Sequence, residues 1–173
     1  HGKNDGGLTD FGREVLRAME ERRMIVDLAH ASPAIVTDVL AAAARPVVIS
    51  HTGVRGACDS PRNISDALMK KVAAAGGLVG IGYWKGAVCD ASPAGVVKAI
   101  RYAIDLLGED HVALGSDFDG AVGTTFDVSE LAVLTREMME AGFTRNEIAK
   151  VMGGNIIRFM RENLPPKPAE PLK

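Results

Sequence analysis

Short apolar runs recur along the chain and are too brief to form helices. Their apolar character is nearly continuous instead of alternating, which is the pattern of parallel strands covered on both faces. The pattern predicts four buried strands, at residues 24–28, 46–49, 78–81 and 112–114.

Segments with a helical period separate these runs. Apolar residues three and four apart form one stripe in each segment, as on the buried face of an amphipathic helix. The stripes fall at residues 11–19, 35–40, 97–107, 131–138 and 148–156. Strand and helix therefore alternate, which is typical of an α/β protein with a parallel sheet, either an open doubly wound sheet or part of a (β/α) barrel.

Three helix starts carry signals that are independent of the stripes. Ser32 and Ser92 each precede a proline, which places a capping hydroxyl before a residue suited to the first helical turn. Thr144 and Glu147 have the spacing of a capping box. We expect helices to begin at these three places.

Composition fits one soluble globular domain. Of the 173 residues, 47% are hydrophobic and 24% are charged, which excludes a disordered, collagen-like or coiled-coil chain. The net charge is -2 and no basic run is present, so nothing indicates a nucleic-acid surface. No apolar stretch approaches the roughly 20 residues that cross a bilayer. Residues 164–173 contain four prolines and are expected to form an extended tail.

The cysteines offer little chemistry on their own. Cys58 and Cys89 are too few for a disulfide scaffold and lack the spacing of metal ligands. Cys58 is predicted to be a packed thiol. Gly77, Gly80 and Gly82 resemble a dinucleotide fingerprint, but they fall within a strand and do not lead into a helix, which argues against nucleotide binding.

Polar residues follow three of the four predicted strands. His30, His51 and Asp117 come at or just after the carboxyl ends of the first, second and fourth runs. These ends meet at one edge of a parallel sheet, and imidazole and carboxylate groups are ligands of catalytic zinc. Either histidine alone is explained as well by a rim side chain bonded to its neighbours. The pattern by itself favours neither a metal site nor a purely structural role for these residues.

The sequence also leads to expectations about three further residues near these strand ends. Ser50 and His51 are strand neighbours and are expected to face opposite ways, so they form no nucleophile and base pair. Only one of Asp117 and Asp119 is expected to reach the centre. Arg62 lies in the loop after His51 and is suited to gripping a carboxylate. Bonding to loop carbonyls explains Arg62 equally well.

Five sequence blocks together resemble the renal (membrane) dipeptidase family of zinc peptidases. They are GLTDFGREV at 7–15, VDLAHAS at 26–32, SHT at 50–52, CDSPRN at 58–63 and GSDFDG at 115–120, with Gly153 and Asn155 in the last helix also agreeing. Their order and spacing agree with the family along essentially the whole chain. No block is specific alone, but the set is.

The resemblance implies a (β/α)8 barrel of the metal-dependent hydrolase type that hydrolyses dipeptides at a dinuclear zinc site. His30 and His51 correspond to zinc ligands, Arg62 to the arginine that binds the substrate's terminal carboxylate, and Asp117 to the aspartate that contacts the substrate and handles the catalytic proton. Tyr83 corresponds more loosely to an aromatic residue near the pocket. The family's other ligands, an early His-x-Asp pair and a bridging glutamate, have no counterpart in this sequence.

A complete barrel needs roughly 250 residues. We therefore expect residues 1–163 to form about four C-terminal β/α units, the C-terminal half of a catalytic barrel. Two alternatives stay open. The chain could be an inactive half-barrel, or a subunit that associates with a second copy or a separate N-terminal half. It could also be another metal-dependent amidohydrolase acting on cyclic amides, although Arg62 suits a free carboxylate better.

Overall fold

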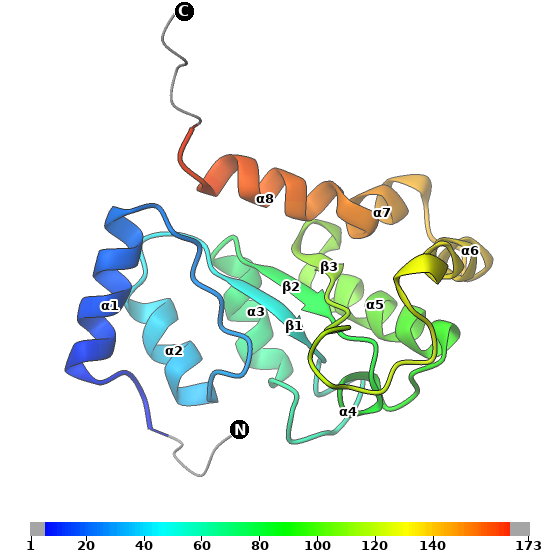
Figure 1. The fold of residues 1–173 in the computed structure, drawn as a ribbon, viewed down its shortest axis with the longest axis horizontal. Coiled ribbons are helices and arrows are strands. Elements are labelled where there is room, and N and C mark those ends of the chain that lie inside the picture. The colour runs from blue at the N-terminus through cyan, green and yellow to red at the C-terminus, as the bar shows by residue number, and fades with distance from the viewer. Residues whose placement is uncertain (1–5, 167–173) are drawn as a thin grey trace, which may run out of the picture.

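A three-stranded parallel sheet lies at the centre of the computed structural model, which describes residues 6–166 (Figure 1). The strands β1 (Val48–Thr52), β2 (Leu78–Ile81) and β3 (Val112–Leu114) stand side by side in chain order. The sequence prediction of β2 and β3 is confirmed. β1 begins and ends later than the predicted run at 46–49, so that it carries His51 within it.

Helices connect and flank these strands. The helices are α1 (Asp10–Glu21), α2 (Pro33–Ala42), α3 (Asp66–Ala74), α4 (Lys85–Val88), α5 (Pro93–Leu107), α6 (Ala132–Glu140), α7 (Arg145–Ala149) and α8 (Asn155–Asn163). Short 3-10 turns occupy Glu109–His111 and Val128–Glu130, and a π turn at Lys150–Gly154 joins α7 to α8. The three predicted helix starts are confirmed, because the side chains of Ser32, Ser92 and Thr144 each accept a backbone hydrogen bond in the first turn.

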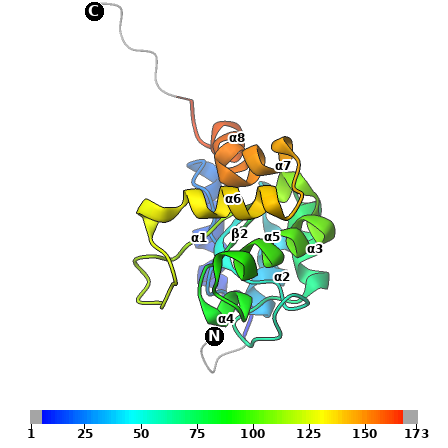
Figure 2. The same cartoon turned by 90° about the vertical axis from the view of Figure 1, so that its right-hand side faces the viewer.

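Both faces of the sheet are covered, as the continuous apolar runs predict. Ile49, Val79 and Val112 belong to the main core, together with buried residues of α2, α3 and α5. Leu78 and Ala113 pack instead against Phe159 of α8. Figures 1 and 2 show α8 lying across the sheet on the side away from α2 and α3.

Two predictions about the N-terminal part need correction. The run at 24–28 forms no regular strand, because its pairing is limited to one parallel bridge between Asp27 and Val48. The stripe of α1 is only partly buried: Leu16 is enclosed, but Phe11 is 73% and Val15 40% exposed. α1 stands at the margin of the described fold, where only one side of it meets other elements (Figure 1).

The predicted extended tail lies largely outside the described residues, which end at 166. The first part of the tail, at Leu164, leaves α8 in an extended conformation. Across residues 6–166, none of the helices combines the length and the apolar character needed to cross a membrane.

Candidate active site

The two histidines at the strand ends meet. His51 lies on β1, and His30 follows the short bridge that pairs the preceding segment with β1. Their Nε2 atoms are 2.9 Å apart and their rings meet edge to face. Two nitrogens that each lie about 2.0–2.1 Å from one tetrahedral zinc ion are separated by about 3.3 Å. The observed spacing is close to this value, so a small movement of either ring lets both nitrogens bind a single metal ion.

The orientation of His51 depends on its neighbour in the chain. Ser50 Oγ lies 2.9 Å from His51 Nδ1. The expectation that these two side chains diverge is wrong, because the register between β1 and β2 shifts between Ile49 and Thr52 and breaks the strand alternation there. With Nδ1 engaged by Ser50, the Nε2 atom of His51 is directed at His30. A metal-binding histidine typically uses its second nitrogen in this way.

A single carboxylate joins the two segments that carry the histidines. Asp27 Oδ1 accepts hydrogen bonds from the backbone nitrogens of Ala29 and Ser50, each at 3.0 Å. Each of these donors immediately precedes one histidine. His30 itself has a left-handed backbone with φ 64°, which is uncommon for a residue with a Cβ. Asp27 therefore fixes the spacing of the two backbones from which the imidazoles extend.

Asp117 reaches the same place from the loop after β3. Its Oδ2 atom is 3.9 Å from His51 Nε2, and its backbone is also left-handed, with φ 56°. Gly120 leaves the space for this carboxylate, because a Cβ there would lie 2.0 Å from Asp117 Oδ1. Phe118 joins the core and Asp119 is exposed. Of the two acids, only Asp117 lies beside the histidines, as expected. Strand alternation is not the reason, because residues two apart share a face of a strand and both acids lie in the loop after β3.

Arg62 places a cation beside this group. Its Nη2 donates to the backbone oxygen of His51 at 3.2 Å, and its guanidinium lies 5.5 Å from the centre of the Trp84 ring. Partial burial lowers the pKa of Arg62, and the charge of Asp117 opposes that shift. Desolvation and the charge of Arg62 both lower the pKa of His30, which favours its neutral, metal-binding form.

The aromatic neighbour of the site is Trp84. Its ring lies 6.0 Å from that of His51. Tyr83, which the resemblance places near the pocket, is fully buried and packs against Phe118 and Phe126 at 5.6 and 5.2 Å between ring centres. Burial also raises the pKa of Tyr83. The sequence offers two consecutive aromatic residues after β2, and only the fold determines which one turns toward the histidines.

The prediction of a packed thiol at Cys58 is wrong. Cys58 and Cys89 form a disulfide that links the loop after β1 to the end of α4. The two residues are 31 positions apart, and no local pattern signals that their segments meet.

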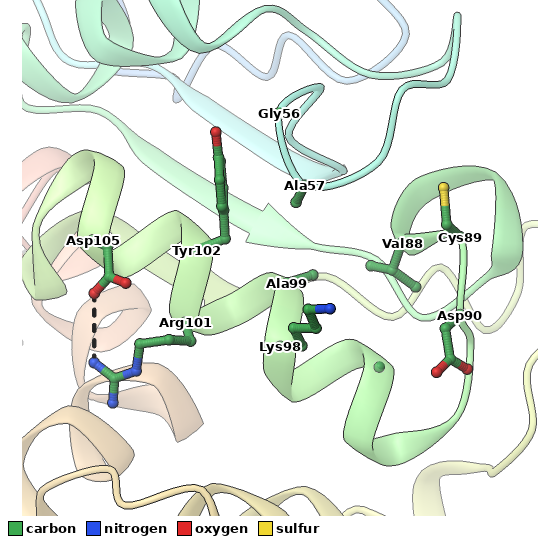
Figure 3. A pocket seen from close by; sticks show the side chains of 11 residues that line it. Gly56, Ala57, Val88, Cys89, Asp90, Lys98, Ala99, Arg101, Tyr102 and Asp105 are labelled. Carbon is green, nitrogen blue, oxygen red and sulfur yellow. Dashed lines mark ion pairs between the residues drawn. The ribbon is translucent and has the colours of Figure 1, made fainter.

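Cys89 also borders a cavity of about 620 Å³ between the β1–α3 loop and α5 (Figure 3). Its charged lining comes from residues such as Asp90, Lys98 and Arg101. His30, His51, Arg62, Tyr83 and Asp117 do not line it. The cavity is therefore a different place from the candidate active site.

The side chains gathered at the site are of the kinds that bind zinc, but they are fewer than a complete zinc site needs. Within residues 6–166, no group of three or more His, Cys, Asp or Glu side chains is gathered closely enough to hold a metal ion. The two converging imidazole nitrogens nevertheless have the chemistry and separation of zinc ligands. The described residues thus fit as part of a metal site.

Sequence comparison identifies close similarity to one protein family. A family model described as membrane dipeptidase, peptidase family M19, matches residues 1–167. Dipeptidase 3 of Rattus norvegicus is 30% identical over 165 residues, which cover 92% of this chain and 34% of the relative. Dipeptidase verJ of Clonostachys rogersoniana is 32% identical over 160 residues, which cover 90% of this chain and 41% of the relative.

Structure comparison gives the same relationship. A metallo peptidase from Rhodobacter sphaeroides, solved with a phosphinate mimic of the dipeptide L-Ala-D-Ala, superposes with a TM-score of 0.85 at 26% identity. The match covers 91% of this chain and 48% of that one. The chain thus spans less than half the length of these relatives.

Proposed function

Because the chain belongs to the membrane dipeptidase family, peptidase family M19, we propose that it contributes to a zinc-dependent dipeptidase that hydrolyses the peptide bond of dipeptides. The observation that carries this proposal is the convergence of His30 Nε2 and His51 Nε2 at 2.9 Å, with Asp117 Oδ2 3.9 Å from His51. The Rhodobacter relative binds a dipeptide mimic, which supports the same substrate class.

His30 and His51 would hold the metal through their Nε2 atoms. When bound, zinc polarises the scissile carbonyl and brings the pKa of a water molecule to about 7, so that a nucleophile exists at neutral pH. Ser50 and Asp27 keep the imidazoles in place through the contacts at His51 Nδ1 and at the two backbone nitrogens. The metal site therefore relies on this chain for two of its ligands and for their orientation.

Asp117 has the position of the residue that moves the proton. Its carboxylate takes the proton from the attacking water and returns it to the leaving amine. Its side chain is only 13% exposed. This limited exposure keeps bulk water from competing for that proton, and the left-handed backbone directs the carboxylate at the histidines.

Arg62 would select the substrate by its free carboxylate. A guanidinium binds a carboxylate through two parallel hydrogen bonds, so a peptide with its terminal carboxylate in this place is restricted to a short length. Trp84 supports the guanidinium from one side at 5.5 Å. A neutral cyclic amide has no carboxylate to accept two parallel hydrogen bonds from the guanidinium, so a free dipeptide is the better fit.

The proposal extends to the fold. Three parallel strands with helices between them are compatible with about four β/α units of a (β/α)8 barrel, formed by residues 1–163. The remaining zinc ligands then come from outside these 173 residues. Zinc stoichiometry separates this proposal from an inactive half-barrel: two tightly bound zinc ions per copy of this chain, once it is assembled with the part that supplies the remaining ligands, would contradict the half-barrel alternative.

Hydrolysis of L-Ala-D-Ala tests the proposal, with this chain assembled with the part that supplies the remaining zinc ligands and loaded with zinc. This assembly is the zinc-loaded protein in the experiments below. We expect amino acids to be released, activity to stop on chelation with EDTA, and activity to return with zinc. The variant Arg62→Ala should raise KM for the free dipeptide about tenfold or more and leave its C-terminal amide comparatively unaffected.

Arg55→Ala is the matched control, because Arg55 lies in the same loop and, among residues 6–166, forms its ion pair with an exposed aspartate 3.9 Å away. It should keep the KM of the unmodified protein. No hydrolysis by the zinc-loaded protein, or hydrolysis that persists after chelation, would contradict the proposal.

A further inference from the structure

Binding a carboxylate with two hydrogen bonds requires the plane of the Arg62 guanidinium to be fixed. Arg62 extends from the loop between β1 and α3, and loops are the most mobile parts of most folds. Its partners, the backbone oxygen of His51 and the ring of Trp84, lie on other segments. The position of the guanidinium therefore depends on what holds this loop against the segment that carries Trp84.

The next residue, Asn63, makes that connection. Its Nδ2 atom donates to the backbone oxygens of Cys58 and Ala87, each at 2.8 Å. Cys58 lies in the same loop as Arg62, and Ala87 lies in α4, directly after Trp84. Both hydrogens of one amide group are thus used to join the two segments, and the side chain is 2% exposed.

The surroundings of Asn63 are built around this amide. A Cβ at Gly53 would lie 2.5 Å from Asn63 Oδ1 and 2.0 Å from the backbone oxygen of Ala87, so no larger residue fits there. Asn63 Oδ1 is buried and has no hydrogen-bond partner among the described residues. The contacts that hold the Asn63 side chain are therefore its two donated hydrogen bonds and the close approach of Gly53.

The disulfide joins the same two segments a second time. Cys58 lies in the Arg62 loop and Cys89 lies just past α4. Cys58 is 3% exposed, whereas Cys89 is exposed and borders the cavity in Figure 3. A small reductant can therefore reach the bond from that side.

We propose that Asn63 is a positioning residue that, together with the Cys58–Cys89 disulfide, fixes Arg62 for the terminal carboxylate of the substrate. The two links hold the loop against α4, so that the guanidinium stays between His51 and Trp84. This inference rests on the proposed dipeptidase function for its substrate, but the placement of Arg62 over Trp84 can be measured without any activity.

The kinetic experiment compares a free dipeptide with its C-terminal amide, using zinc-loaded protein and the variants Asn63→Ala and Asn63→Asp. Aspartate has the same shape but cannot donate to the two carbonyls. We expect the preference for the free dipeptide, measured as the ratio of kcat/KM values, to fall about tenfold, mainly through KM. Reduction of the unmodified protein with a phosphine should lower the same ratio in the same direction.

Asn163→Ala is the matched control. Asn163 is also a buried asparagine, 8% exposed, and its Nδ2 donates to the backbone oxygen of Phe159 at 2.9 Å, on α8. Its loss should lower the melting temperature without changing the substrate ratio. An unchanged ratio in folded Asn63 variants, or an equal fall in Asn163→Ala, would overturn the inference. If the Asn63 variants do not fold, the test is made with the reduced protein. An unchanged ratio of kcat/KM values after reduction would then overturn the inference.

Fluorescence provides the readout that is independent of activity. Trp84 is the single tryptophan of the sequence and is 9% exposed beneath Arg62. Quenching of Trp84 by acrylamide should rise in Asn63→Ala toward the value for Arg62→Ala, and should not change in Asn163→Ala. Quenching equal to that of the unmodified protein would overturn the inference. Absence of dipeptide hydrolysis with the expected change in quenching would instead contradict only the proposed function.

Discussion

At the scale of single residues, two residues of the site have backbone conformations that cost energy. His30 and Asp117 both have left-handed backbones without being glycine. Such conformations cost about 1–3 kcal/mol each and persist only where the surroundings impose them. Here the surroundings are the Asp27 contacts beside one histidine and the space left by Gly120 at the aspartate. Both strained residues lie where the proposed chemistry needs them.

Asp117→Asn tests the assignment of the proton-transfer role. We expect kcat for dipeptide hydrolysis to fall by at least about 100-fold, because an amide cannot take and return a proton. Bound zinc, measured by atomic absorption, should stay unchanged. Asp119→Asn, on an exposed side chain of the same loop, should keep normal kcat. Near-normal turnover in Asp117→Asn would exclude this role.

Ser50→Ala tests the orientation of His51. Loss of the contact at His51 Nδ1 should weaken zinc binding about 10–100-fold, as for other groups that orient metal-binding histidines. Competition with a chromophoric chelator measures the affinity. Ser50→Thr keeps the hydroxyl and should restore most of the affinity, and Ser65→Ala, which removes an exposed hydroxyl at the start of α3, should have no effect. Equal affinity in all variants would refute the orienting role.

At the scale of elements, local signals act together with contacts between helices. The capping box of α7 illustrates this: Glu147 accepts from the backbone nitrogen of Thr144 at 2.7 Å and pairs with Arg101 of α5 at 2.6 Å. These bonds lower the pKa of Glu147 to about 2, with the Arg101 contact as the largest cause. The spacing of the box is visible in the sequence, but the arginine from α5 is not.

The lowered pKa makes this contribution to stability depend on pH. A carboxyl group with a depressed pKa in the folded state stabilises the protein above its unfolded pKa, near 4.5. That stability is lost as the pH falls from there toward about 2. Glu147→Gln should therefore lower the free energy of unfolding by about 1–2 kcal/mol at pH 7 and progressively less below pH 4.5.

Urea unfolding at several pH values measures this difference. Glu140→Gln is the control, because Glu140 forms an exposed pair with Arg136 at 3.9 Å and should change stability by less than about 0.5 kcal/mol. If the free energies of unfolding of the Glu147 variant and the unmodified protein differ by the same amount from pH 7 to pH 3, the ion pair is not the cause of the difference.

At the scale of the whole molecule, the sheet is stabilised from both sides. The side opposite α3 and α5 is covered by α8, whose Phe159 is 1% exposed and packs against Leu78 and Ala113. Asn155, at the start of α8, adds hydrogen bonds to the backbone oxygens of Glu109 and Val112 at 2.7 and 2.8 Å. The last helix thus fixes the strands from which the site extends.

Phe159→Ala should lower the free energy of unfolding by about 3–5 kcal/mol, because it leaves a cavity against the sheet. Urea unfolding followed by circular dichroism measures the change. Ile157→Ala removes a side chain of the same helix that is 51% exposed and should cost much less. A similar small effect in both variants would mean that α8 does not support the sheet.

The sequence by itself determined the features that arise from local patterns. Continuous apolar runs predicted β2 and β3, and serine–proline pairs and a capping box predicted three helix starts, because backbone conformation and capping depend on residues close in the chain. Strand ends and family motifs pointed to His30, His51, Arg62 and Asp117 as one group. These four residues do lie together: His51 lies on β1, His30 follows the bridge to β1, Asp117 follows β3, and Arg62 donates to the backbone of His51.

Only the tertiary structure decided the contacts between distant segments. The shift in the register of β1 turned Ser50 toward His51, and the packing of Tyr83 into an aromatic cluster left Trp84 beside Arg62. The Cys58–Cys89 bond and the Asn63 bridge likewise depend on a loop and a helix meeting. Such contacts follow from packing in three dimensions, where one residue's partner is set by the positions of whole elements and not by its neighbours in the chain.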